Sequence, residues 1–485
     1  MSLKQQATKS ILWSAIERFS TQGMQFVFTI VIARILVPED YALVAMLGIF
    51  MALSQLLIDS GFGNALIQKQ NRSQIDYSTV FYFNFAFSAF IYLLLYISAP
   101  FIADFYEQPL LQKVLRIYGL NLIIRSLAIV QQTHLTIHLD FKRQALVSLV
   151  AVAVSGIVGV VMAYYDMGVW ALVWQALSCS ICWVAGLWLL SRWFPVWAFS
   201  MQSFRGLFSF GSKLMLADAL HTFYVNMYSL VIGKVFPAST LGYFNRAYTL
   251  GQFPVQNFTN IFFRVIYPVQ CRYQNDDAKF RFIFMAYTKL SSFIIFPLML
   301  GMASLASPLI SLLLTDKWLP IVPLLQIICL SMLWDPIRRI NCSALDAKGR
   351  SDYRLYSEIW KKTAAFIILF ASIPFGIEVV CWGLLLYALI DVAIIAVYSR
   401  KVTDIGLWWQ IKAIFPILVL SLVMAFFVYF LTCLIDIRWL QLLAGTCAGV
   451  LFYIGAAYLM KWKEIRFLWA LLVDRKSFNI EELDL

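Results

Sequence analysis

The chain has 485 residues, of which 61% are hydrophobic and only 13% are charged. A soluble protein carries about 25% charged residues, which cover its water-facing surface. The composition therefore excludes an ordinary soluble domain and indicates a protein that lies mainly within a lipid bilayer. At roughly 20 apolar residues per span, a chain of this length accommodates on the order of 12 to 14 transmembrane helices.

Hydropathy and helix-breaking residues predict an all-α, polytopic membrane protein with about 14 spans and short loops. In chain order, the predicted spans are 11–36, 41–62, 77–99, 115–139, 143–165, 168–190, 207–236, 239–266, 281–313, 319–345, 356–374, 377–399, 408–432 and 438–460. No segment outside these spans is long enough for a sizeable soluble domain.

The formal net charge of +12 raises the question of a nucleic-acid partner. The basic residues are scattered at the ends of the predicted helices and form no basic face interleaved with aromatic residues, so we expect no nucleic acid. They collect instead in alternate loops, as at Lys142 and Arg143 and again at Arg400 and Lys401. Because positive residues mark cytoplasmic loops, we expect an even number of spans with both termini in the cytoplasm.

A weak internal repeat relates the two halves of the chain. The segment ARILVP at 33–38 has a counterpart in GKVFP at 233–237, and each is followed by a short polar turn. Two halves of six helices are implied, and because six is even the repeat is parallel. We therefore predict an N-terminal lobe at 1–198, a C-terminal lobe at 199–402, two additional helices at 403–460 and a cytoplasmic tail at 461–485. Two such lobes are expected to surround a central cavity.

Ionisable residues inside the predicted spans are the candidate functional residues, since each costs about 2.5 to 3.5 kcal/mol on insertion scales. The set includes Glu17, Arg18, Asp59, Arg125, Lys213, Asp218, Arg246, Asp335, Arg338, Arg339 and Asp391. The first helix of each half is the most polar, so we expect its charges to face a shared central space. A structural alternative stays open for Arg338 and Arg339, which could lie near helix ends and reach the membrane surface.

Known catalytic motifs are missing from the sequence. It contains no GxxxxGK[ST] loop, no HExxH and no GxSxG. We therefore expect no ATP-driven pump on this chain, no enzyme, no metal site and no cofactor.

Three further motifs carry a family resemblance. They are KSILWS at 9–14, ARILVPEDY at 33–41 and above all DSGFGNALIQ at 59–68, which is followed by TVF at 79–81. On these residues the chain resembles the polysaccharide flippases of the multidrug/oligosaccharidyl-lipid/polysaccharide exporter superfamily. It looks most like the branch of lipopolysaccharide and exopolysaccharide exporters of the colanic-acid type. The resemblance covers the first half in motif and the second half in topology.

This resemblance implies a flippase that carries an undecaprenyl-pyrophosphate-linked oligosaccharide from the cytoplasmic to the periplasmic leaflet of a bacterial inner membrane by alternating access. It would serve lipopolysaccharide or exopolysaccharide biosynthesis, with membrane lipids, a polysaccharide polymerase and the export machinery as partners. The expected pyrophosphate and cavity residues are Arg18, Lys213, Arg246, Arg125 and Arg338. By analogy with the multidrug branch, the candidates for proton or sodium coupling are Glu17, Asp59, Asp218 and Asp335.

Two other functions stay open at the level of sequence. A cation-coupled multidrug antiporter would share the architecture. A membrane-embedded polysaccharide polymerase would commonly need a long exposed loop, whereas the predicted outer loops have ordinary connector lengths.

Overall fold

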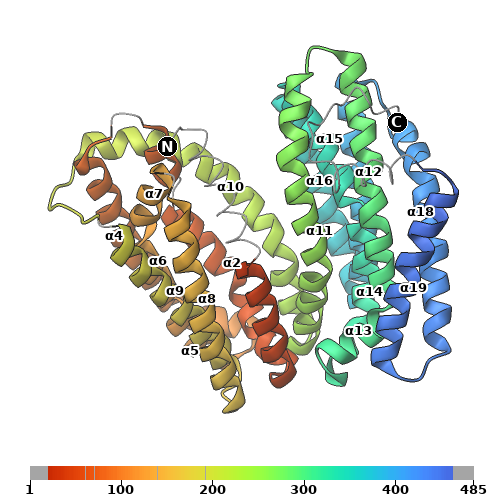
Figure 1. Ribbon diagram of the computed structural model, residues 1–485. Helices are drawn as coiled ribbons and strands as arrows, with labels where there is room; N and C mark the ends of the chain where they lie inside the picture. Colours follow the sequence, from red (N-terminus) through yellow and green to blue (C-terminus); the bar gives the residue numbers. More distant parts are fainter. Residues whose placement is uncertain (1–19, 60–61, 70–71, 139, 192, 463–485) are drawn as a thin grey trace. The chain divides into compact units, whose positions relative to one another are not determined.

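The computed structural model describes residues 20–59, 62–69, 72–138, 140–191 and 193–462, and these residues are almost entirely helical (Figure 1). By their contacts they form two compact units that divide between Gly242 and Tyr243. Ten helical segments in the described part are long and apolar enough to cross a membrane. The prediction of an all-α, polytopic membrane protein is confirmed.

The first unit begins with a helical segment at 20–35. It continues with α2 (Pro38–Asp59), α3 (Phe62–Gln68), α4 (Gln74–Tyr106), α5 (Pro109–Tyr118), α6 (Leu120–Ser126), α7 (Ile129–Ile137), α8 (Phe141–Tyr164), α9 (Val169–Ser191) and α10 (Met201–Val235). The next helix, α11 (Ala238–Arg272), starts in the first unit and runs on into the second.

The second unit continues with α12 (Asp277–Ser304), α13 (Ala306–Leu313), the 3-10 turn η1 (Asp316–Trp318), α14 (Ile321–Met332), α15 (Asp335–Ala347), α16 (Ser351–Ser372), the 3-10 turn η2 (Ile373–Phe375), α17 (Ile377–Thr403), α18 (Leu407–Cys433) and α19 (Arg438–Leu459). Every predicted span therefore coincides with helix in the described residues. Three predicted spans are broken into shorter helices: 115–139 is α5 to α7, 281–313 is α12 and α13, and 319–345 is α14 and α15.

The repeated segments 33–38 and 233–237 each form a helix end followed by a new helix, with the same backbone hydrogen bond at both places. The helix at 20–35 ends where the Leu36 amide donates to the Ile32 carbonyl at 2.9 Å, and α10 ends where the Phe236 amide donates to the Ile232 carbonyl at 2.9 Å. The following helices start at Pro38 and at Ala238, at the same offset. A proline at or just before the start suits both helices, because the first helical amides have no intrahelical acceptor. The division of the chain at 198/199 and at 402/403 remains a prediction.

The first unit packs by close approach of long helices. α8 and α9 lie side by side along their lengths (Figure 1). At Gly186 in α9, an added Cβ would lie 2.8 Å from a methyl carbon of Val147 in α8, so only glycine allows the helices to approach this closely there. In the same unit, Phe62, Tyr77, Phe81 and Trp193 form a buried aromatic cluster. Such packing matters in lipid, which offers little hydrophobic drive for helix association.

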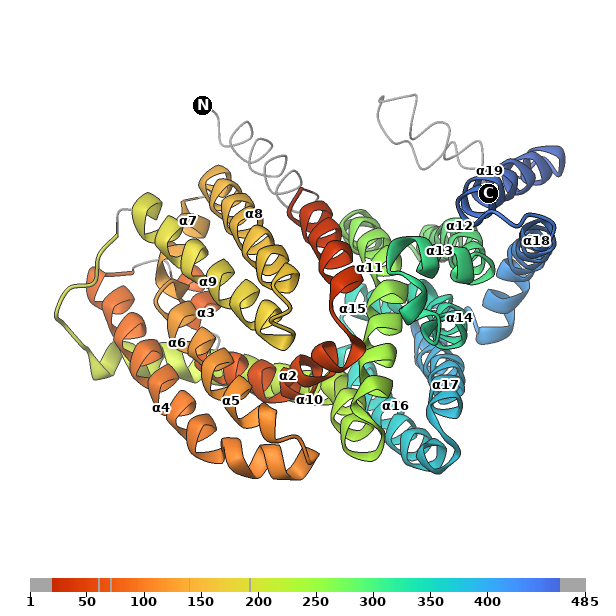
Figure 2. The same cartoon turned by 90° about the horizontal axis from the view of Figure 1, so that it is seen from below.

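The second unit contains α16 and α17 as a packed pair, and α12 packs against α18 (Figure 2). The pair α18 and α19 carries some of the most exposed apolar side chains of the unit, such as Phe426 and Leu451. Exposed aromatic and aliphatic side chains on a spanning helix are expected where the helix faces lipid. α16 also has the length of a span, in agreement with the predicted span 356–374, although the charged residues in its first half keep it out of the ten most apolar segments.

Candidate functional site

The structure describes only part of the predicted set of functional residues. Glu17 and Arg18 lie outside the described residues. Lys213 and Asp218 lie within α10, but their side chains are outside the described part as well. The roles assigned to these four residues remain predictions.

In the first unit, two predicted residues come near one another. Asp59 is the last residue of α2 and accepts a hydrogen bond from Gln55 Nε2 at 3.0 Å. The positive charge of Arg125, on α6, is close enough to act on that carboxylate. The Arg125 guanidinium also lies 5.6 Å from the centre of the Trp183 ring on α9. Arg125 is exposed, and it lies beside an aromatic ring and within electrostatic range of Asp59.

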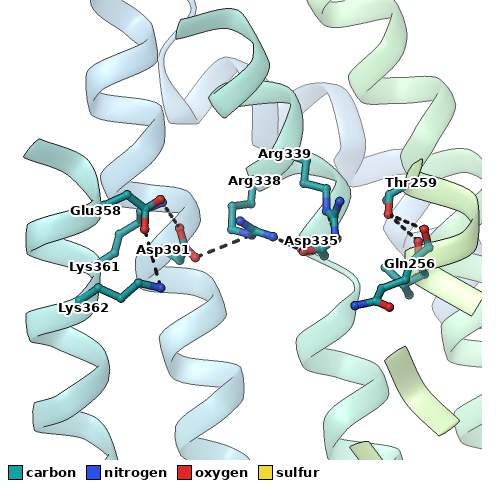
Figure 3. A network of polar contacts seen from close by, with 10 residues as sticks. Gln256, Thr259, Asp335, Arg338, Arg339, Glu358, Lys361, Lys362 and Asp391 are labelled. Carbon is teal, nitrogen blue, oxygen red and sulfur yellow. Dashed lines mark hydrogen bonds and ion pairs between the residues drawn. The ribbon is translucent and has the colours of Figure 1, made fainter. Parts of the chain in front are cut away.

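In the second unit, the structure brings Asp335 and Arg338 together with Arg339 at the start of α15 (Figure 3). Arg338 Nη2 donates to Asp335 Oδ1 at 2.5 Å, and Arg339 Nε donates to Asp335 Oδ2 at 2.8 Å. Both oxygens of one carboxylate are therefore engaged by two neighbouring guanidinium groups. Arg246, on α11, is also buried in this unit, with 7% of its surface exposed.

The position of Asp335 follows from a break in the predicted span 319–345. α14 ends at Met332 and α15 begins at Asp335, so a new helix N-terminus lies inside the membrane-spanning segment Ile321–Ala347. A carboxylate is stabilised in the first turn of a helix by the partial positive charge of the free amides. Because Arg338 and Arg339 follow Asp335 by three and four residues, both arginines lie on the same face of the helix as Asp335. The interruption is a kink, because Leu333 and Trp334 keep helical backbone angles and Pro336 has no amide to bond the Met332 carbonyl.

A second carboxylate extends the group to two more helices. Asp391 Oδ2, on α17, lies 3.8 Å from Arg338 Nε, and Asp391 Oδ1 lies 3.3 Å from Lys361 Nζ on α16. Lys361 also donates to Glu358 Oε1 at 2.5 Å, and Lys362 Nζ lies 3.7 Å from Glu358 Oε2. These contacts connect α15, α17 and α16 (Figure 3).

Taken in order of contact, the seven groups alternate strictly in sign. We call them the charge chain: Arg339, Asp335, Arg338, Asp391, Lys361, Glu358 and Lys362. It starts and ends with a cation, so its four cations exceed its three carboxylates by one positive charge. In a low-dielectric surrounding, such charges are tolerated only when they are paired. The excess makes the charge chain suited to an anionic ligand.

Burial differs along the charge chain. The Lys361 side chain is 1% exposed and that of Asp391 is 7% exposed, whereas those of Arg338 and Glu358 are about one-third exposed. Asp391 and Lys361, at the centre of the charge chain, are therefore buried in the protein interior. Arg338 and Glu358, on either side of them, reach a surface of the unit. Within the described residues, no cluster of His, Cys, Asp and Glu has the makeup of a metal site.

Sequence reasoning found part of this site and missed the rest. It selected Asp335 and Arg338 for their cost in a membrane and noted Arg339 and Asp391 among the charged residues. It passed over Glu358, Lys361 and Lys362, although their i, i+3 and i+4 spacing was a readable signal of a charged helix face.

Comparison with known proteins identifies the family. A family model described as polysaccharide biosynthesis protein matches residues 31–323. The chain belongs to this family. It is 25% identical to the teichuronic acid biosynthesis protein TuaB of Bacillus subtilis (strain 168), over 81% of either chain. It is 24% identical to the lipopolysaccharide biosynthesis protein WzxC of Escherichia coli (strain K12), over 74% of either chain.

The fold also occurs in solved transporter structures. The lipid II flippase MurJ, in an inward closed conformation, aligns with 93% of this chain and 99% of its own at a TM-score of 0.76 and 17% identity. An inward-facing multidrug resistance transporter of the MATE family aligns with 80% of this chain and 98% of its own at a TM-score of 0.58 and 15% identity. At these identities the likeness defines the fold and leaves the substrate open.

Proposed function

We propose that this member of the polysaccharide biosynthesis family is a flippase for a lipid-linked oligosaccharide. The cargo would be an undecaprenyl-diphosphate-linked glycan, moved from the cytoplasmic to the periplasmic leaflet of a bacterial inner membrane by alternating access. Both termini would be cytoplasmic, and the chain would perform no chemical step. Support comes from the family match, since the relatives TuaB and WzxC are named for teichuronic acid and lipopolysaccharide biosynthesis.

The physical observation that carries the proposal is the charge chain on α15, α16 and α17. A diphosphate with several sugars cannot cross hydrocarbon unassisted, because moving charged and polar groups out of water costs tens of kcal/mol, to order of magnitude. Polar and cationic groups inside the membrane lower that cost. The charge chain supplies four cations and one excess positive charge within the second unit. The predicted residues Arg18, Lys213, Arg246 and Arg125 would add further cations.

Translocation of an anionic cargo could be driven by the membrane potential alone, without ATP hydrolysis by this chain. A membrane potential that is negative inside favours outward movement of an anion by about 2.3 kcal/mol per charge per 100 mV. Coupling to protons or sodium through Glu17, Asp59, Asp218 or Asp335 remains an additional proposal. Partners would be the cargo, membrane lipids and the polymerase that consumes the flipped glycan.

A cation-coupled multidrug antiporter is the second candidate, favoured by the likeness to the MATE-family structure. Deletion of the gene in its native host separates the two functions. A flippase predicts accumulation of a lipid-linked oligosaccharide in the deletion strain, detected by mass spectrometry, and its disappearance on complementation. Unchanged export of the glycan together with raised sensitivity to cationic dyes would contradict the flippase and support the antiporter.

A further inference from the structure

The two carboxylates that hold Arg338 belong to different parts of the structure. Asp335 lies on the same helical turn as Arg338 and Arg339, so its ion pairs stay within α15. Their loss would break no contact between helices.

Asp391, in contrast, connects three helices. It stands on α17 and pairs with Arg338 on α15 and with the fully buried Lys361 on α16. Removing one partner of a buried ion pair leaves an uncompensated charge and is strongly destabilising. Arg338 therefore has one fixed counter-ion, Asp391, and one replaceable counter-ion, Asp335.

The replaceable end of the charge chain faces a polar stretch of α11. Figure 3 shows Gln256 and Thr259 of α11 beside the Asp335 end, and Gln256 is exposed. Tyr248, also on α11, is near enough to experience the charges of both Asp335 and Arg338. Thr259 is buried and donates to the Val255 carbonyl, so an anion arriving at this end would meet the exposed amide of Gln256 together with the two guanidinium groups.

The contacts of Asp335 have the form of an oxyanion complex. Two adjacent guanidinium groups each donate to a different oxygen of one planar anion. Phosphate oxygens accept the same charge-assisted donors, and arginine is the residue that suits them best. A phosphate group can therefore accept from the same donors in place of the carboxylate.

We propose that the Arg338–Arg339 pair is the binding site for the diphosphate group of the cargo and that Asp335 is its internal competitor. This inference rests on the proposed flippase function. Asp335 occupies the two arginines when the cargo is absent, gives way when a diphosphate arrives and returns when it leaves. The competitor lowers the affinity of the site and thereby speeds release, while Asp391 and Lys361 keep Arg338 in position.

The test is equilibrium binding of inorganic pyrophosphate to the purified full-length protein in detergent. Asp335→Asn removes the competing charge in a side chain of nearly the same size. We expect binding at least tenfold tighter than in the wild type, because pyrophosphate no longer has to displace charge-assisted hydrogen bonds from both arginines. Arg339→Gln should weaken binding by about tenfold, because one charge-assisted donor is lost. A thermal unfolding midpoint close to that of the wild type establishes that each variant is folded.

Glu358→Gln is the matched control, because it raises the net charge of the charge chain by the same unit at the other end. It should tighten pyrophosphate binding far less than Asp335→Asn does. Equal tightening by both variants would overturn the inference, since the effect would then be general attraction rather than competition at one site. Unchanged affinity in Asp335→Asn would overturn it as well.

A transport measurement tests the role of Asp335 as a competitor separately from the proposed flippase function. In proteoliposomes, Asp335→Asn should lower KM for the lipid-linked oligosaccharide and lower kcat, because release becomes slow. A purely structural ion pair would leave KM unchanged. If the wild type transports the cargo but Asp335→Asn does not change pyrophosphate binding, the competitor role of Asp335 is refuted and the flippase function is not. If Asp335→Asn binds pyrophosphate more tightly but the wild type transports no cargo, the flippase function is refuted and the anion-binding site is not.

Discussion

Replacing Lys361 with methionine should destabilise the protein far more than the same replacement of its neighbour Lys362. The Lys361 side chain is 1% exposed, and its ammonium lies 3.3 Å from Asp391 and 2.5 Å from Glu358. Lys361→Met removes the charge and keeps most of the apolar stem. It leaves Asp391, itself 7% exposed, with only Arg338 at 3.8 Å among its contacts in the charge chain.

The magnitude follows from the burial of each pair. Loss of one partner of a buried ion pair costs about 3 to 5 kcal/mol. Because Asp391 keeps Arg338, we expect the free energy of unfolding to fall by about 3 kcal/mol, the lower end of that range. Lys362 is 27% exposed and lies 3.7 Å from Glu358, so Lys362→Met should cost no more than about 1 kcal/mol.

Reversible unfolding in bicelles, measured by steric trapping, gives the required free energies. A double-mutant cycle with Asp391→Asn isolates the pair, because that variant removes the charge that Lys361→Met leaves behind. We expect the double variant to lose about as much stability as either single variant, and thus a coupling of about 2 to 3 kcal/mol. Additive losses, or equal losses in Lys361→Met and Lys362→Met, would refute the assignment of Lys361 as the buried centre of the charge chain.

Two further predictions concern other parts of the chain. Gly242→Ala should destabilise the first unit by about 1 to 3 kcal/mol, because the new Cβ would lie 2.1 Å from the Pro38 carbonyl oxygen. Gly455 has open space around it, so Gly455→Ala is the control and should be neutral or slightly stabilising in the same unfolding assay. In the loop after α13, a hydrogen bond from the Ser311 hydroxyl and the charge of Arg438 hold the pKa of Asp316 below its usual 3.8. This contribution to stability is present above pH 3.8 and is lost as the pH falls through the lower pKa of the folded state. Arg438→Gln should raise the pKa of Asp316 in NMR titration of labelled carboxyl carbons, and an unchanged pKa would contradict the pairing.

The positions of the helices could be predicted because hydropathy and positive loops are local properties of a membrane chain. Two of the three breaks inside spans also follow from the sequence. α12 ends at Ser304 and α14 ends at Met332, each four residues before a proline, Pro308 or Pro336, that has no amide to bond that carbonyl. The breaks between α5, α6 and α7 have no proline, so only the folded unit reveals them.

The candidate site was predictable where the membrane makes a charge expensive. Asp335 and Arg338 were selected for that reason, and the structure brings them together. Lys361 was passed over because the span was predicted to begin at 356, which would leave the lysine near the membrane surface. The helix begins at Ser351, so Lys361 lies about three turns inside it and is buried. Its partner Asp391 comes from another helix, and sequence separation gives no indication of that pairing.

The most direct test is translocation by the purified protein itself. Proteoliposomes loaded on one leaflet with the lipid-linked oligosaccharide from the native host should expose it on the other leaflet, as read by a membrane-impermeant reagent that modifies the glycan. We expect transport by the wild type and its loss in Arg338→Gln/Arg339→Gln, with both proteins folded. Wild-type proteoliposomes that expose no more glycan than protein-free liposomes, or a double variant that transports at the wild-type rate, would contradict an intramembrane cationic site for an anionic lipid-linked cargo.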